Sequence, residues 1–200
     1  RVFLATQPHL GDRPVVLKLT ASLGHEHLSL ARLQHTHISP LYSVQDFPAL
    51  GLRALCMPYF GGTTLAQALE MLKGRPVEHR TGQHLLDGLD EVQRSAPISL
   101  PSRGPAWQFF SHASYVQSIC WIGACLADAL EYAHERGLLH LDLKPSNVLL
   151  MSDGQPMLLD FHLAHAPIQP GSQTPDWLGG TVGHMSPEQQ FALTAVRTRQ

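Results

Sequence analysis

The chain has 200 residues, of which 44% are hydrophobic and 15% are charged, a balance that predicts a folded core in one or two domains rather than a disordered chain. Its formal net charge of −2 provides no basic surface for nucleic acid or anionic membranes. No apolar run reaches the roughly 18 residues that a membrane-spanning helix needs. Three cysteines form no disulfide framework and predict a reducing, cytoplasmic location. The first residue is Arg1 rather than Met, so we expect a piece of a longer protein.

The first sixty residues favour β-structure. Two β-rich runs, Val2–Ala5 and Pro14–Leu19, flank a turn signal at residues 10–12 and predict a hairpin. The other expected elements of this part are a helix at residues 24–34 and strands at residues 41–44 and 52–57.

After Gly61-Gly62 the pattern becomes helical. Leucines three and four residues apart predict a helix over Thr64–Leu72. Residues 73–113 contain several Pro and Gly, with one amphipathic patch at Leu85–Val92. We interpret residues 73–113 as an insertion that contains one weak helix.

The clearest predicted helix is Ser114–Arg136. Ser114 and Gln117 form a capping box at its start, and Gly137 suits the position just past its end. Apolar and small residues three and four apart predict its buried face, namely Val116, Ile119, Gly123, Leu126, Leu130 and Ala133.

The strongest chemical signal surrounds two predicted strands, Val148–Leu150 and Met157–Leu159. The run His-Leu-Asp-Leu-Lys-Pro-Ser-Asn at residues 140–147 precedes them, and Asp160-Phe161-His162 follows them. Phosphoryl transfer needs a group that orients the attacking hydroxyl, cations on the phosphates, and oxygen ligands for those cations. Each residue alone has an ordinary structural interpretation, such as a turn-capping Asp or a solvated Lys. Their combination favours phosphoryl transfer.

These residues resemble the catalytic loop and the magnesium loop of protein kinases. Other segments resemble further kinase motifs in the family's order, namely residues 15–18, 55–62 and 180–188. The resemblance implies an α+β, two-lobed protein-kinase-like fold that is incomplete at both ends. A small antiparallel β-sheet lobe would occupy residues 1–60, without a glycine-rich loop. A mainly helical lobe would occupy residues 61–200, with the insertion at residues 73–113.

The resemblance also implies a role for each site residue. Asp142 would be the catalytic base, Lys144 would neutralise the transferred phosphate, and Thr181 would contact both. Asn147 and Asp160 would hold Mg²⁺, for which carboxylate and carboxamide oxygens are suitable ligands. The implied catalytic set is Asp142, Lys144, Asn147 and Thr181. The implied ATP-binding set is Val2, Lys18, Glu26, Met57, Pro58, Phe60 and Asp160.

Two parts of the implied ATP site depart in detail from the family. Lys18 would contact the α and β phosphates and pair with Glu26, at a spacing shorter than the family usually shows. We interpret this as a helix trimmed at its front. Met57 would border the adenine pocket, with the backbone at Pro58 and Phe60 facing the adenine edge, and Pro58 would keep its carbonyl while lacking an N–H.

Three further departures from the family's pattern have larger consequences. The glycine-rich loop that covers the phosphates is absent, so this chain alone is expected to bind ATP poorly. Leu141 replaces the Arg that pairs with a phosphorylated activation loop, which argues against activation by loop phosphorylation. His162 replaces the Gly after Asp-Phe and restricts the backbone there.

The favoured function is ATP-dependent phosphorylation of protein serine or threonine hydroxyls (EC 2.7.11 type) with ATP and Mg²⁺, although this fragment alone could be inactive. The expected partners are a protein substrate, which could be the protein itself, and further domains of the parent chain. Nucleic acid and a membrane segment are not expected.

Three alternatives stay open. Leu141 and His162 motivate a pseudokinase, a nucleotide-binding or scaffolding module without turnover. A small-molecule kinase would share the Asp…Asn spacing, but Lys144 and the Ser-Pro-Glu at 186–188 argue against it. A zinc site is a weaker alternative, with the histidine cluster His25, His27, His35 and His37 as ligands.

Overall fold

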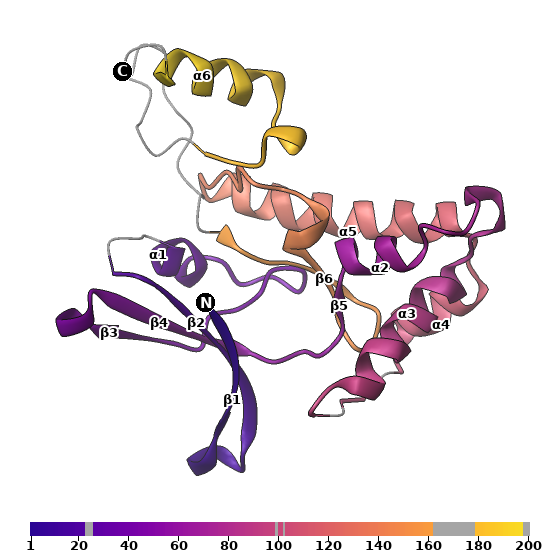
Figure 1. Cartoon of the computed structure of the whole chain (residues 1–200), viewed down its shortest axis with the longest axis horizontal. Coiled ribbons are helices and arrows are strands. Elements are labelled where there is room, and N and C mark those ends of the chain that lie inside the picture. The colour runs from indigo at the N-terminus through magenta and orange to yellow at the C-terminus, as the bar shows by residue number, and fades with distance from the viewer. Residues whose placement is uncertain (23–25, 99, 102, 162–178, 198–200) are drawn as a thin grey trace.

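The computed structural model describes residues 1–22, 26–98, 100–101, 103–161 and 179–197. It has a mixed α+β fold, with a four-stranded and a three-stranded antiparallel sheet accompanied by helices. In Figure 1 the four-stranded sheet and α1 lie to the left, α2 to α5 lie to the right, and α6 lies above them. None of the helices within these residues is long and apolar enough to cross a membrane.

The four-stranded sheet has the order β1-β2-β4-β3. Its strands are β1 (Val2–Gln7), β2 (Arg13–Ala21), β3 (Ser43–Phe47) and β4 (Leu52–Pro58). The predicted hairpin is confirmed, because β1 pairs with β2 across a turn in which Gly11 and Asp12 have positive φ. Lys18 lies on the central strand β2, opposite Leu55 of β4, and this pairing fixes its position in the sheet.

Helix α1 (Glu26–Ala31) connects β2 to β3 and is shorter than the expected helix, whose residues 24 and 25 lie outside the described residues. Its Leu30, together with Leu33 and Ile38 just beyond it, packs in a buried cluster with Leu158 and Phe161. Ile38 also forms a parallel bridge with Leu158. The segment after α1 therefore joins the four-stranded sheet to the rest of the molecule.

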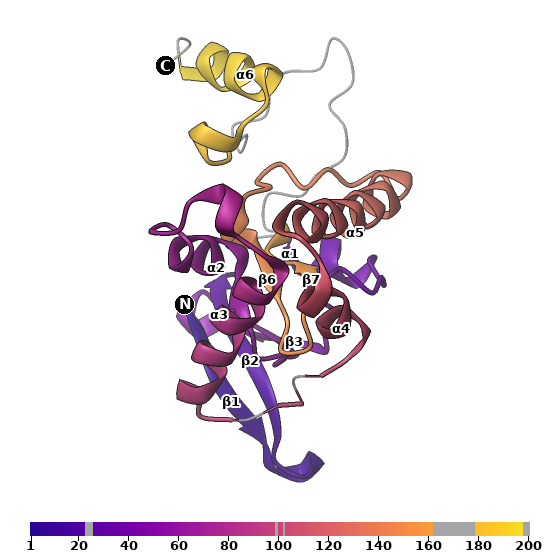
Figure 2. The same cartoon turned by 90° about the vertical axis from the view of Figure 1, so that its right-hand side faces the viewer.

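The second part of the chain contains most of the helices. The short sheet has the order β5-β6-β7. Its strands are β5 (Thr63–Thr64), β6 (Val148–Leu150) and β7 (Pro156–Leu158). The helices are α2 (Leu65–Met71), α3 (Gly82–Ser95), α4 (Pro105–His112), α5 (Tyr115–Glu135) and α6 (Pro187–Arg197). Figure 2 shows α2, α3, α4 and α5 gathered around these short strands.

The ends of α5 are as predicted, but its buried face is not. The Ser114–Gln117 capping box is present, and Gly137 follows the helix with φ 67°. However, Val116 is 65% exposed and Gly123 is also exposed, whereas the buried residues are Ser118, Ile122, Ala129 and Ala133. The helix carries apolar residues on several sides, so their periodicity alone is compatible with more than one buried face. The small side chains of Ala129 and Ala133 let the observed buried face pack closely against β7.

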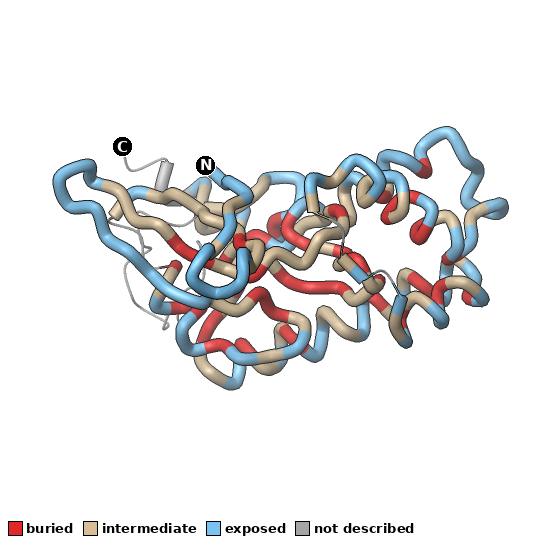
Figure 3. The backbone as a smooth tube through the Cα atoms, turned by 90° about the horizontal axis from the view of Figure 1, so that it is seen from below, coloured by how far each residue is buried: buried red, intermediate tan, exposed pale blue. Residues whose placement is uncertain are grey.

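Residues 73–113 form two α-helices, not one weak helix. Leu85, Leu86 and Leu89 of α3 and Phe110 of α4 are fully buried in a cluster with Ala68 and Ile122 of the flanking helices. Figure 3 shows buried positions running through this region, while the turns of the four-stranded sheet are exposed. Helix α4 was missed because it is short and starts at Pro105, which suits the first helical position but reads as a breaker in sequence.

We predict that this region stabilises the fold. Leu86→Ala should lower the free energy of unfolding by about 2–5 kcal/mol, because it deletes a fully buried side chain and leaves a cavity. The matched change Leu50→Ala, at a residue 70% exposed, should cost less than about 0.5 kcal/mol. Urea unfolding of both variants measures the difference. Equal stability of the two variants would show that α3 contributes little to the core.

Candidate active site

The loop between α5 and β6 is braced by His140. This side chain is buried, its Nε2 lies 2.9 Å from the Leu159 carbonyl, and its Nδ1 accepts from the Asp142 N–H at 3.3 Å. Since Nδ1 accepts, Nε2 carries the proton and donates. The ring also packs edge-on against Phe161, with 4.6 Å between the centroids. His140 thus ties the loop that carries Asp142 to the segment that carries Asp160.

Asp142 is the centre of a buried hydrogen-bond network. Its Oδ1 accepts from the Thr181 N–H at 2.9 Å and from the Thr181 hydroxyl at 2.8 Å. Its Oδ2 accepts from Lys144 Nζ at 2.6 Å and from Asn147 Nδ2 at 3.2 Å. Lys144 Nζ also donates to Thr181 Oγ1 at 2.7 Å. The structure therefore brings the predicted catalytic residues together, although their roles stay predictions.

The network keeps Asp142 ionised. Burial raises the pKa of this carboxyl, but the hydrogen bonds from Lys144 and Thr181 and the Lys144 charge outweigh burial and hold the pKa below its usual value. A buried carboxylate with several donors can orient a hydroxyl as an acceptor at neutral pH.

A second polar group lies on the sheet side. Lys18 Nζ donates to Glu26 Oε1 at 2.7 Å and also forms an ion pair with Asp160. Burial lowers the pKa of the Lys18 ammonium, but the two carboxylates outweigh burial and raise the pKa above its usual value. The predicted Lys18–Glu26 pair is thus present, despite its short spacing. Asp160 has φ 67°, an uncommon backbone conformation for a non-glycine residue that often occurs at functional sites.

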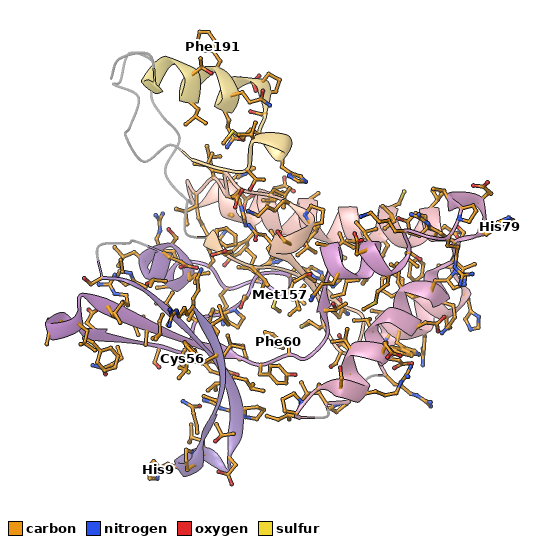
Figure 4. The ribbon with its side chains drawn as sticks, viewed as in Figure 1. His9, Cys56, Phe60, His79, Met157 and Phe191 are labelled. Atoms are coloured by element: carbon orange, nitrogen blue, oxygen red, sulfur yellow. The ribbon has the colours of Figure 1, made fainter. Side chains whose placement is uncertain are left out.

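One cavity of about 330 Å³ lies between the four-stranded sheet and the short strands. It is lined by every residue of the predicted ATP-binding set, namely Val2, Lys18, Glu26, Met57, Pro58, Phe60 and Asp160, and also by Asn147. Figure 4 shows Phe60 on the connection that leaves β4, between the sheet and the helices. The cavity volume lies at the small end of the range of pockets that hold small molecules.

Some lining residues were missed from the sequence. Leu149 lines the cavity from β6, while its neighbours Val148 and Leu150 are buried on the other face of the strand. Strand alternation could have identified it, since successive side chains point to opposite faces. Val16 and Leu159 also line the cavity. With Met57 and Val2, these residues give the cavity apolar walls that suit a flat aromatic ring.

Asn147 and Asp160 fit a magnesium ion. Both line the cavity, and because the Asn147 amide nitrogen donates to the Asp142 carbonyl at 2.9 Å, its oxygen is the atom left for a cation. Magnesium needs only one or two protein oxygens when phosphates and water supply the rest.

The histidines of the alternative zinc site have other neighbours. His35 contacts Asp128 at 3.1 Å, His37 contacts the Pro156 carbonyl at 2.8 Å, and His27 contacts Arg53 at 2.8 Å. His25 lies outside the described residues. Within the described part of the chain, no group of three or more His, Cys, Asp or Glu side chains is placed to hold a metal ion.

Besides the Thr181 bonds to Asp142 and Lys144, residues 179–189 contact the loop that carries Asp142 through uncharged groups. Gln189 Nε2 donates to the Leu141 carbonyl at 2.8 Å, and Leu141 has φ 63°. Gly180 has φ 139°, and a Cβ there would lie 2.9 Å from the same carbonyl, so a larger residue would not fit. The spacing of Ser186 and Gln189 is typical of a helix cap. The hydrogen bond from Gln189 to the Leu141 carbonyl cannot be predicted from that spacing. The predicted departure at His162 lies outside the described residues.

The Asp142 network should make stability depend on acid pH. Because the folded-state pKa of Asp142 is lowered, its contribution is present above the unfolded pKa of about 3.9 and is lost as pH falls through the folded value. Asp142→Asn should therefore destabilise the protein by about 1–3 kcal/mol at neutral pH and by much less at an acid pH below the folded-state pKa. Asp87→Asn, at an exposed site on α3, is the control. An Asp142→Asn deficit that is the same at both pH values would contradict this prediction.

Part of the chain is similar in sequence to known proteins. The sequence model described as Protein kinase domain matches residues 111–192. Over 118 residues the chain is 34% identical to serine/threonine-protein kinase PknI of Mycobacterium tuberculosis. This alignment covers 56% of this chain and 17% of PknI. Over 73 residues it is 42% identical to serine/threonine-protein kinase AfsK of Streptomyces coelicolor. This alignment covers 36% of this chain and 9% of AfsK. The chain thus spans less than a fifth of the length of these relatives. Residues 111–192, which hold the Asp142 network, match the protein kinase domain family, and the chain is partly similar to bacterial serine/threonine kinases.

Proposed function

We propose that this chain is the catalytic part of a protein serine/threonine kinase that transfers the γ-phosphoryl group of ATP to a protein hydroxyl. One observation carries the proposal. The cavity that contains Lys18, Asn147 and Asp160 adjoins the Asp142 network, because Asn147 lines the cavity and also donates to Asp142. A nucleotide phosphate and an acceptor hydroxyl could therefore meet at Asn147. In this proposal residues 1–60 and 61–200 act as two lobes around the nucleotide.

The sheet side would bind the nucleotide. Lys18 keeps its charge at neutral pH, because its pKa is raised, and would contact the α and β phosphates. The Pro58 carbonyl and the Phe60 N–H would face the adenine edge. The Phe60 carbonyl accepts from Ser152 N–H at 3.2 Å, which fixes this connection against the helical part. The apolar walls would hold the adenine ring.

The loop side would carry the transfer. The acceptor hydroxyl would bind at Asp142, which takes its proton as the oxygen attacks the γ-phosphorus. The new bond joins that oxygen to phosphorus, the bond to the β-phosphate oxygen breaks, and ADP leaves. Lys144 would neutralise the transferred group, while Thr181 holds both side chains. Asn147 and Asp160 would hold Mg²⁺, which supplies positive charge on the phosphates.

We place this activity in the cytoplasm and assign it a protein substrate, either the protein itself or another protein. The thiols of Cys56, Cys120 and Cys125 support the location, because all three are free. The serine/threonine class is supported by Lys144 and by the partial similarity to bacterial serine/threonine kinases.

A pseudokinase is the second candidate, and Leu141 favours it. At this position the chain has no cation that could respond to a phosphorylated segment. A module that binds nucleotide without turnover would retain the cavity, and for binding it would need only Lys18 and the apolar walls of that cavity.

Phosphoryl transfer from radiolabelled ATP with magnesium separates the two candidates. The full-length protein should incorporate label, whereas Asp160→Ala should lose at least about 100-fold in rate, because it removes a metal-holding carboxylate. Asp87→Ala, at an exposed site, is the control and should keep its activity. Nucleotide binding without label in the parent protein would favour the pseudokinase.

Thr181 should act as a positioning residue. Thr181→Ala removes the hydroxyl that bonds both Asp142 and Lys144 and should lower kcat by about 10- to 100-fold. Thr181 does not line the nucleotide cavity, so the KM for ATP should stay within about twofold. Thr181→Ser keeps the hydroxyl and should retain most of kcat. A parallel loss in both variants would show that the methyl group or the backbone matters instead.

A further inference from the structure

A further cavity, here called the basic cavity, borders residues 144–146 of the loop that carries Asp142. It has a volume of about 460 Å³. Its walls come from α2, the connection between α2 and α3, the catalytic loop and the turn after Thr181, and the lining residues are Ala66, Leu69, Glu70, Lys73, Arg80, Lys144, Pro145, Ser146 and His184. Ser146 lines both the basic cavity and the nucleotide cavity. A molecule in the basic cavity would therefore lie next to the site of transfer.

The charge of this lining is positive. Lys73, Arg80 and Lys144 contribute three cations, of which Lys144 is paired with Asp142 at 2.6 Å, and Glu70 is the single carboxylate among the lining residues. Glu70 is already paired with Lys73 at 2.8 Å, and both side chains are largely exposed at 65% and 74%. This concentration of cations contrasts with the net charge of −2 of the whole chain.

The α2–α3 connection extends this positive surface. Residues 72–81 include Lys73, Arg75 and Arg80, with Glu78 as their only acid. Arg80 is held in place, because its Nε donates to the Arg75 carbonyl at 2.9 Å and its guanidinium lies 5.6 Å from the centre of the Tyr115 ring. A held guanidinium loses less entropy when it binds an anion. Figure 4 shows His79 of this connection at the outer end of the helical part.

We propose that the basic cavity binds an acidic segment of the protein substrate, in which carboxylate or phosphorylated side chains flank the acceptor hydroxyl. This inference rests on the proposed function and names its substrate class. Lys73 and Arg80 attract the acidic side chains, while Ala66, Leu69 and Pro145 form an apolar floor for the rest of the segment. Because Ser146 lines both cavities, the acceptor hydroxyl would lie close to Asp142. Exposed charges such as those of Lys73 and Arg80 act chiefly on the selectivity and the rate of association.

Direct binding tests this inference without requiring turnover. Fluorescent peptides with one acceptor serine flanked by glutamates, by phosphoserines or by glutamines are titrated into the full-length protein. At low salt both acidic peptides should bind about tenfold more tightly than the glutamine peptide, and the difference should shrink as salt rises. The phosphoserine and glutamate peptides together show which anion is preferred.

The chain supplies a closely matched control for the charge. Lys73 and Arg94 are 74% and 70% exposed, and each pairs with a glutamate three residues earlier. Lys73→Glu should weaken binding of the acidic peptide by about fivefold or more, whereas Arg94→Glu, outside the basic cavity, should not change it.

Each outcome has a separate meaning. Equal binding of acidic and neutral peptides, or equal effects of Lys73→Glu and Arg94→Glu, would overturn the inference. Inorganic phosphate that binds in a Lys73-dependent way, with no preference among the peptides, would also overturn it and leave a small-anion site. If acidic peptides bind through Lys73 but are never phosphorylated, the basic cavity stands and the proposed kinase activity fails.

Discussion

The buried carboxylate of Asp142 is the constraint around which the loop between α5 and β6 and residue 181 are arranged. A charge removed from water must be compensated by donors at close range, or it neutralises. Here Lys144 and Asn147 supply those donors from the same loop as Asp142, and Thr181 supplies them from a distant stretch of the chain. The need to satisfy this group fixes the distance between the catalytic loop and residue 181, although 39 residues separate Asp142 from Thr181. The same donors that stabilise the carboxylate therefore assemble the predicted catalytic residues.

The ion pair between Lys18 and Asp160 has the corresponding role between the two parts of the fold. Lys18 lies on the central strand of the large sheet, and Asp160 follows β7 of the short sheet. Lys18, its second partner Glu26, and Asp160 all line the cavity between the two parts. Opposite charges placed there also match what a nucleotide with its metal requires, since the lysine suits phosphates and the carboxylate suits a cation. Binding would thus exchange one set of charge partners for another.

The sequence predicted the features that depend on local spacing and failed where packing decides. The β1–β2 hairpin, the caps of α5 and the predicted ATP-binding residues, which all line one cavity, follow from turn residues, capping signals and motif spacing, whereas Val16, Leu149 and Leu159 were missed. The buried face of α5 does not, because several apolar stripes compete and only the packed neighbours choose among them. Helix α3 was predicted as one weak helix through its patch at Leu85–Val92, whereas α4 was missed because it begins at Pro105. The bond from Gln189 to Leu141 joins residues 48 apart and leaves no mark in sequence.

That bond changes how the loss of an arginine at position 141 should be understood. An arginine there would connect the catalytic loop to the following segment through charge, and the connection would depend on phosphorylation. In this chain one part of the connection is made by a carboxamide, a backbone carbonyl and a glycine that lets the two backbones approach. The other part is made by the bonds of Thr181 to Asp142 and Lys144. Neither part requires phosphorylation. The Thr181 hydroxyl is held at Asp142 by contacts that need no covalent modification, so Leu141 does not by itself argue against an ordered catalytic network.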